Sequence, residues 1–176
     1  MASWADIVGE HSPGVWRTAY RLLNNRADAD ECMQEAFVTA VWLSRRKEIR
    51  SWGGLLHRLV TARALDRLRS RLRESARQEE VADWAMIPSG DPPPERAAWN
   101  GELVDRLRAC LARLPARGAE AFCLRFLNEM SYEDIAQQLH VSVNHVGVIL
   151  NRARERLREL WTVVAATEGS GGADND

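Results

Sequence analysis

The stretch Ser131–Trp161, SYEDIAQQLHVSVNHVGVILNRARERLRELW, predicts two helices joined by a tight turn. In its first part, apolar side chains recur at i, i+3, i+4 and i+7, which is one face of a helix. Ser131 precedes this stripe as an N-cap, and Asp134 occupies the third helical position of a near capping box. His140 and Val141 form the predicted turn. The apolar stripe consists of Tyr132, Ile135, Ala136 and Leu139.

The second helix of this stretch divides into a buried and an exposed face, and Ser142 is its predicted N-cap. This is the layout of a helix-turn-helix, whose second helix enters the DNA major groove by its N-terminal end. A helical hairpin that only packs is the alternative, since such hairpins are common. The predicted buried stripe consists of Val146, Leu150, Ala153, Leu157 and Leu160. The opposite face carries Asn144, His145, Val148, Asn151 and Arg152.

Charge is distributed unevenly along the 176 residues. The net charge is only −1, but residues 44–73 carry ten Lys or Arg against two Asp or Glu. A nearly neutral chain therefore contains one strongly basic block, as expected for a site that binds a polyanion. All of these basic residues except Lys47 are Arg, which suits bidentate contacts to phosphate.

The composition predicts a cytoplasmic protein that is not an enzyme. No run approaches the roughly 18 apolar residues of a membrane span, and no signal peptide opens the chain. Three cysteines without CxxC spacing fit reduced thiols, and Cys32 and Cys123 lie at predicted core positions as small hydrophobes. The four His residues are scattered, and no nucleophilic, metal-binding or phosphate-loop constellation is visible. We therefore expect no metal and no cofactor.

Helical periodicity extends over almost the whole chain, so we expect an all-α fold. An apolar stripe ends near Asn24, Asp28 caps a second helix, and Ser51 caps a long third helix that runs to about residue 78. Two further helices are predicted at residues 103–114 and 117–128, ahead of the helix-turn-helix.

The polar, Pro-rich segment 88–94 cannot continue a helix and has the composition of a semi-rigid linker. It predicts two small helical domains, residues 1–80 and 102–161, joined by a linker at 81–101. Residues 162–176 are rich in Gly, Ser and Asp and are expected to be a disordered tail.

Acidic and amide side chains cluster near the start of the helix that Asp28 is predicted to cap. Acidic groups at this position interact favourably with the helix dipole. A contact surface for a basic partner is the other interpretation, and the residues alone do not rank the two. The cluster consists of Asp30, Glu31, Gln34 and Glu35.

The basic block covers a loop and the long helix after it. Arg residues at i and i+4 in that helix repel one another, at a few tenths of a kcal/mol for each pair. A solvated face could have used Glu–Arg pairs, so we interpret the block as a nucleic-acid site. Trp52 either belongs to the core or stacks on an unpaired base, a contact of about 1–3 kcal/mol. His57 is predicted on the surface of the helix.

Two series of motifs in this order resemble a known family. The first half contains DADECMQEAF and LLHRLVTARALDRLRSRLR, and the second contains LPARGAEAFCLRF, SYEDIAQQL and NRARERLREL. Together they resemble the sigma factors of bacterial RNA polymerase, in particular the extracytoplasmic-function (ECF) type of the sigma-70 family. The resemblance covers residues 10–161.

The resemblance implies a role for each cluster. The acidic helix would bind core RNA polymerase through Asp30, Glu31, Gln34 and Glu35. The basic loop and helix would bind and help melt the minus-ten promoter element through Arg45, Arg46, Lys47, Arg50, Trp52, Arg58, Arg63 and Arg67. The helix-turn-helix would read the minus-thirty-five element through Ser142, Asn144, His145, Val148, Asn151, Arg152 and Arg154. An anti-sigma factor that holds the two domains closed is a further partner common in this family.

Several residues depart from the family pattern. His140 stands where Gly is usual, which requires a side chain in a turn that favours positive φ. Gly147 lies in the recognition helix, where it is about 1 kcal/mol less favourable than Ala. Leu55, Ala62 and Ala119 replace the usual Trp, Asn and Arg. Two other classes of protein therefore stay open: a stand-alone helix-turn-helix regulator, and a sigma-like module that binds proteins only.

Overall fold

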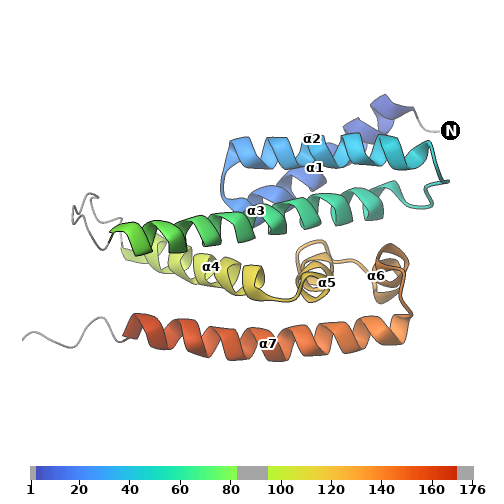
Figure 1. Cartoon of the computed structure of the whole chain (residues 1–176). Helices are drawn as coiled ribbons and strands as arrows, with labels where there is room; N and C mark the ends of the chain where they lie inside the picture. Colours follow the sequence, from blue (N-terminus) through green and yellow to red (C-terminus); the bar gives the residue numbers. More distant parts are fainter. Residues whose placement is uncertain (1–2, 83–94, 170–176) are drawn as a thin grey trace, which may run out of the picture.

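The computed structural model describes residues 3–82 and 95–169, which contain seven α-helices and no strand (Figure 1). The prediction of an all-α fold is confirmed. None of the helices in these ranges is both long and apolar enough to cross a membrane. The helices are α1 Trp4–Leu23, α2 Arg26–Ser44, α3 Trp52–Ala82, α4 Glu95–Arg113, α5 Ala116–Phe126, α6 Tyr132–Leu139 and α7 Val143–Gly169.

Helix α3 is the centre of the molecule. Helices α1 and α2 pack on one side of it, and α4, α5 and α6 pack on the other (Figure 1). The helix is therefore buried on both sides along much of its length. One hydrophobic cluster extends through it, from Ile7 in α1 to Leu160 in α7. The buried residues in the N-terminal half of α3 are Leu55, Leu56, Val60, Thr61, Ala64, Leu65 and Leu68.

The helix-turn-helix has a small core of its own beside this cluster. Its buried side chains come from α5, α6 and α7, so the two helices of the motif pack against a third. The predicted stripes of α6 and α7 supply most of this core. Its largest members are Leu124, Ile135, Leu139, Val146 and Leu150.

Three of the four predicted helix caps are confirmed, Ser51, Ser131 and Ser142, and one is wrong. Ser51 Oγ accepts a hydrogen bond from Gly54 N, and Ser131 Oγ accepts one from Asp134 N. The cap of α2 is Asn25, not Asp28, because Asn25 Oδ1 accepts from Asp28 N at 3.0 Å. Asn and Asp are about equally good caps, so the sequence alone does not separate them.

The ends of several helices differ from the predictions. Helix α4 begins at Glu95, inside the residues assigned to the linker, where a run of good helix formers continues the helix backwards. The Pro-rich segment 88–94 lies outside the described residues. Helix α7 continues to Gly169, so the predicted tail is helical from residue 162 to that point. Trp161, just before this segment, packs against the shared core.

The three cysteines are buried as free thiols. Burial raises the pKa of the Cys32 and Cys110 thiols, and it raises the pKa of Cys123 to about 12. A thiol with so high a pKa is protonated at neutral pH and is a poor nucleophile. The interpretation of Cys32 and Cys123 as core residues is confirmed.

Candidate nucleic-acid interface

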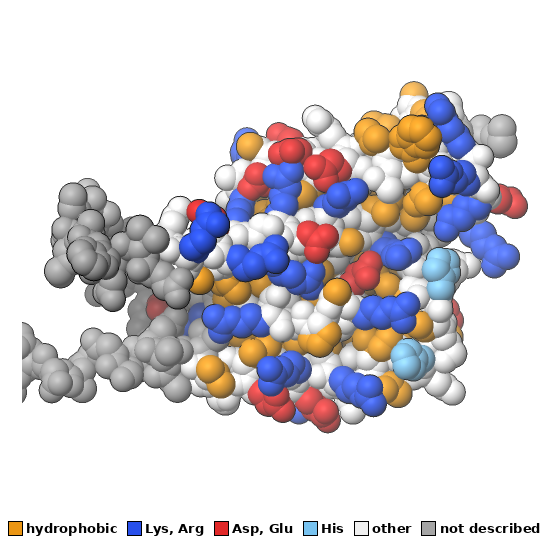
Figure 2. Space-filling view, viewed as in Figure 1, with side chains coloured by type: hydrophobic (Ala, Val, Ile, Leu, Met, Phe, Trp, Pro, Cys, Tyr) orange, Lys and Arg blue, Asp and Glu red, His pale blue; other side chains and the backbone are white. Residues whose placement is uncertain are grey.

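The loop between α2 and α3 presents the basic side chains of the predicted minus-ten set. Arg45, Arg46, Lys47 and Arg50 are all exposed there. The loop lies at the same end of the molecule as α6 and the start of α7 (Figure 1). Basic side chains gather at this end, whereas acidic side chains gather over the first half of α2 (Figure 2).

Trp52 lies at the edge of the core rather than in free solvent. Its ring meets the ring of Trp4 edge to face, with 5.0 Å between centroids. It also packs against the shared hydrophobic cluster and is half-buried. Of the two interpretations that the sequence allows, the packing supports the core position.

Arg58 points away from the loop and toward the second half of the chain. Its Nε donates to Glu120 Oε1 of α5 at 3.2 Å, and both side chains are partly buried. Burial raises the pKa of the Glu120 carboxyl, and the nearby Arg58 only partly offsets this effect. The ion pair is therefore not strongly stabilising, although removal of one partner would leave an uncompensated charge.

Arg63 and Arg67 face the acidic cluster of α2. Arg67 pairs with Glu31 Oε2 at 2.8 Å, with Asp28 Oδ1 at 2.9 Å and with Glu35 Oε1 at 3.5 Å. Arg63 Nε lies 3.6 Å from Glu35 Oε2. The acidic cluster and the basic helix, which the sequence analysis treats as separate sites, thus form one network of ion pairs.

This network weakens one argument from the sequence. The repulsion among Arg residues of α3 is compensated across the helix interface, where Asp28 pairs with both Arg67 and Arg71. The repulsion among these Arg residues is therefore not by itself a sign of a nucleic-acid site at Arg67 and Arg71. The pattern indicates helix pairing as well as a nucleic-acid site.

The outward face of α2 carries residues outside this network. Asp30 Oδ1 accepts a hydrogen bond from the indole Nε1 of Trp16 at 2.7 Å, and Gln34 is exposed. Val38 and Trp42 continue the same face at i+4 and i+8 from Gln34, with 59% and 58% of their surfaces exposed. Sequence reasoning missed these two apolar residues because their spacing also fits a buried stripe.

The turn of the helix-turn-helix depends on His140, whose φ is 54° in the left-handed region. His140 N donates to Ala136 O and so ends α6, as predicted for this position. Ser142 Oγ accepts from His145 N at 3.2 Å, so Ser142 caps α7. That hydrogen bond occupies Ser142 in the free protein.

The exposed face of α7 agrees with the prediction. Arg154, by contrast, places its guanidinium 5.1 Å from the ring centroid of Phe126 and packs on α5. Val143, at the first position of the helix, is 40% exposed and adds an apolar contact point that the sequence analysis missed. All side chains of the predicted minus-thirty-five set are exposed: Ser142, Asn144, His145, Val148, Asn151, Arg152 and Arg154.

Gly147 is not required by packing. A Cβ added there would meet only the Tyr132 ring, at 3.9 Å, which is ordinary contact. We expect Gly147→Ala to stabilise the protein by about 1 kcal/mol, because Ala is the better residue inside a helix. Thermal unfolding measured by circular dichroism checks this. Gly54→Ala is the contrasting variant, since its Cβ would lie 2.8 Å from Gln138 Nε2 and no stabilisation is expected. A lower melting temperature for Gly147→Ala would contradict the prediction.

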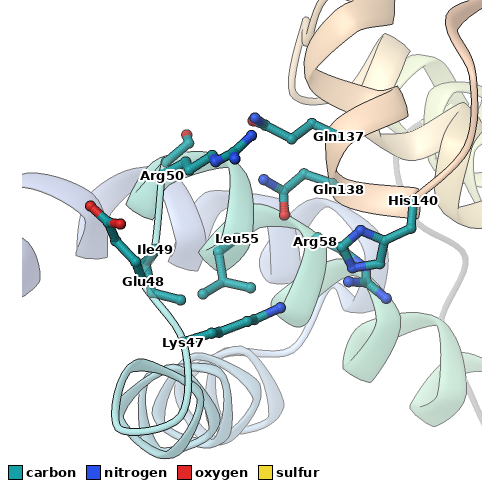
Figure 3. Close-up of a pocket in the computed structure, with 10 residues that line it drawn as sticks. Lys47, Glu48, Ile49, Arg50, Leu55, Arg58, Gln137, Gln138 and His140 are labelled. Atoms are coloured by element: carbon teal, nitrogen blue, oxygen red, sulfur yellow. The ribbon is translucent and has the colours of Figure 1, made fainter.

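A cavity of about 280 Å³ separates the loop from the helix-turn-helix. Figure 3 shows Lys47 and Arg50 on the loop side of this cavity and Gln137 and His140 on the side of α6, and Arg58 of α3 also lines it. The fold therefore brings the two predicted DNA-binding regions, about 90 residues apart in the chain, to one end of the molecule.

His57, predicted on the surface of its helix, is partly covered by a neighbouring helix. It lies half-buried against α1, with Nδ1 3.2 Å from Thr18 Oγ1. Burial lowers the pKa of His57, and the nearby His11 and Arg17 lower it further. The part of the chain that is described contains no group of His, Cys, Asp and Glu side chains able to hold a metal ion.

The fold is all-helical and exposes both a basic loop and a helix-turn-helix. These are the features of a helical DNA-binding protein. Comparison with known proteins identifies a family within this class. The sequence profile described as "Sigma-70 region 2" matches residues 7–74, and that described as "Sigma-70, region 4" matches residues 105–157.

Relatives agree with both profiles. The ECF RNA polymerase sigma factor SigE of Mycolicibacterium smegmatis is 34% identical over 161 residues, which cover 90% of this chain and 62% of SigE. The ECF RNA polymerase sigma factor SigW of Bacillus subtilis is 27% identical over 164 residues, which cover 89% of this chain and 88% of SigW. This chain thus spans less than two thirds of the mycobacterial protein.

A solved structure agrees in fold. The sigma factor RpoE of Bartonella quintana, crystallised with the anti-sigma factor NepR, has a TM-score of 0.52 and 22% sequence identity. The match covers 89% of this chain and 94% of that one. The chain belongs to the sigma-70 family of RNA polymerase sigma factors and is of the ECF type.

Proposed function

We propose that this protein binds core RNA polymerase and directs it to promoters, where it helps to start transcription. The observation that carries the proposal is the presence of sigma-70 regions 2 and 4 in one chain and in this order. If the protein were a stand-alone regulator, one of the two alternatives, its match to region 2 would have no functional explanation.

The surface proposed to bind polymerase is the outward face of α2. Glu31 and Glu35 are engaged with Arg63 and Arg67, so their charges are partly neutralised within the molecule. Within the predicted set, Asp30 and Gln34 are the more available side chains. Exposed Val38 and Trp42 extend the same face and would supply the apolar anchors that strong protein contacts need.

The surface proposed for the minus-ten element is the loop of exposed Arg45, Arg46, Lys47 and Arg50. Their charge suits a phosphate backbone, which provides most of the electrostatic attraction in DNA binding. Trp52 follows the loop directly, as the first residue of α3. The other members of the predicted set, Arg58, Arg63 and Arg67, must exchange their present carboxylate partners for phosphate before they contact DNA.

The surface proposed for the minus-thirty-five element is the exposed face of α7. Asn144 and Asn151 have the amide geometry that pairs with adenine, and Val148 can touch a thymine methyl group. Arg152 is expected to meet phosphate, which positions the protein without specifying a sequence. His145 belongs to the same face. In the free protein Ser142 caps α7, and Arg154 packs on Phe126 of α5.

Arg152→Ala is expected to weaken DNA binding about equally for all sequences. It should also lower the slope of log affinity against log salt by about one unit, since one phosphate contact is lost. Fluorescence anisotropy with several duplexes over a salt series measures both quantities. Arg156→Ala is the matched control, because Arg156 already pairs with Glu159 at 2.7 Å. A selective loss at one base position would instead make Arg152 a reader.

The arrangement of the free protein does not fit both promoter elements at once. Elements at minus ten and minus thirty-five are about 25 base pairs apart, or about 85 Å at 3.4 Å per base pair. Helix α7, with 27 residues, is only about 40 Å long. The loop and α6 line the same cavity. We therefore propose that the two halves separate when the protein engages a promoter.

The remaining roles follow from this function. The chemistry of RNA synthesis belongs to polymerase, so the protein is proposed to act as a non-enzymatic factor. Its place of action would be the cytoplasm, where bacterial polymerase works. An anti-sigma factor is a proposed regulator, in keeping with the relative that was crystallised with NepR.

Co-purification with core RNA polymerase tests the proposal. We expect a stoichiometric complex that survives size-exclusion chromatography. A folded chain that elutes separately from polymerase but still binds duplex DNA would support the stand-alone regulator. A folded chain that binds neither would support the protein-interaction module.

A further inference from the structure

The loop between α5 and α6 inserts an amide side chain between α1 and α3. Thr18 Oγ1 of α1 donates to Asn128 Oδ1 at 2.6 Å, and Asn128 Nδ2 donates to Thr61 Oγ1 of α3 at 3.4 Å. Both Thr side chains are buried. One partly buried residue of the second half therefore bridges two buried hydroxyl groups of the first half.

Other polar contacts surround this bridge. Arg21 Nη1 donates to Leu127 O at 3.1 Å, and Arg108 donates to Arg21 O through Nη2 at 2.9 Å. The ion pair of Arg58 and Glu120 lies on the side of α5 that faces α3. These polar contacts lie beside an apolar one, since side chains of α4, α5 and α7 belong to the same hydrophobic cluster as those of α1–α3. They fix the position of the second half on the first in addition to that apolar packing, each at about 0.5–1.5 kcal/mol net.

The Thr18 hydroxyl has a second acceptor. Its Oγ1 lies 3.1 Å from Gly14 O in its own helix, in addition to Asn128. A hydroxyl carries one proton, so it can turn to Gly14 O when Asn128 leaves. The first half thus keeps this buried group satisfied in an open form as well as in the closed one.

We propose that Asn128 is a latch that holds the free protein closed, with the helix-turn-helix half fixed on α1 and α3. In the closed form Arg58 is engaged by Glu120, and α6 stands across the cavity from Lys47 and Arg50. Opening the latch releases Arg58 and uncovers this side of the loop. The consequence for promoters rests on the proposed function, but the latch itself is a property of the chain alone.

Small-angle X-ray scattering of the full free chain tests the latch. The wild type should have a radius of gyration near that of a compact chain of this length, about 16 Å. Asn128→Ala should increase it by several ångströms at unchanged helicity, and its affinity for duplex DNA should rise several-fold. Glu133→Ala, an exposed change in the neighbouring helix, is the control and should alter neither quantity.

A second pair of variants keeps the test decisive if Asn128→Ala folds poorly. Glu120→Arg places two positive charges together and should open the chain, and Arg58→Glu in the same protein should restore compactness. Unchanged radii for both Asn128→Ala and Glu120→Arg would overturn the proposal. The radius of gyration is measured without polymerase or promoter DNA. The latch can therefore be refuted while the proposed function stands, and the proposed function can be refuted while the latch stands.

Discussion

Replacing both Asp30 and Glu31 by Arg is expected to lower the affinity for core RNA polymerase at least about 100-fold, or about 2.7 kcal/mol. The change reverses two charges on the face of α2 that is proposed to meet a basic partner, and like charges across an interface are strongly unfavourable. It also places positive charge beside Arg67, which Glu31 now neutralises at 2.8 Å. Titration of labelled protein with polymerase measures the loss.

Two comparisons separate a lost contact from a damaged fold. Gln34→Arg with Val38→Arg changes the same exposed face without breaking an ion pair, and the same loss is expected. Glu10→Arg with Glu133→Arg adds the same charge at exposed sites away from α2 and should leave the affinity nearly unchanged. Equal affinity for all three variants would contradict the assignment of α2 as the polymerase surface.

Leu139→Asp is expected to unfold the helix-turn-helix half, at about 4 kcal/mol or more. Leu139 is only 3% exposed and lies in the small core of α5, α6 and α7. A large aliphatic side chain lost from a core is worth 2–5 kcal/mol, and a buried carboxylate without a partner adds to that loss. Helicity should fall, and the circular dichroism melt should shift to lower temperature.

The control for this variant is two residues away. Gln137 is exposed on the same helix, so Gln137→Asp introduces the same charge without burying it. It should change the melt only slightly. If Leu139→Asp melted like the wild type, the register of α6 and the identity of its buried face would be incorrect.

The helix-turn-helix could be predicted because its signals are local. The apolar spacing of α6, the caps Ser131 and Ser142 and the turn at His140 all lie within a few residues of the groups they satisfy. The same holds for the exposed face of α7, which is fixed once the buried face is known. The start of α1 was also signalled, by the capping box of Ser3 and Asp6, but no apolar stripe drew attention to it.

Contacts between distant segments could not be predicted in the same way. Nothing in the sequence near Arg58 identifies Glu120 as its partner, and an isolated Asn128 in a loop has no local pattern. The ion pairs between α2 and α3 depend on how two neighbouring helices pack, and charge counts along the chain do not contain that information. This is why Arg63 and Arg67 were predicted to meet DNA before any internal partner was apparent.

The candidate site also divides into features that the sequence predicts by itself and features that it does not. Periodicity and charge located the basic loop and the reading face of α7, while the assignment to polymerase and to two promoter elements came from resemblance to a family. The structure adds that the two regions predicted to bind DNA line one cavity in the free protein. A change of arrangement is therefore part of the proposed function.

Run-off transcription from a library of promoter fragments, with core polymerase in the presence and absence of this protein, tests the central claim most directly. The account predicts new transcripts that start a fixed distance downstream of two shared sequence blocks, and their loss with the Asp30 and Glu31 double reversal. Transcripts identical to those of core polymerase alone, from a protein that is folded and present in excess, would contradict it.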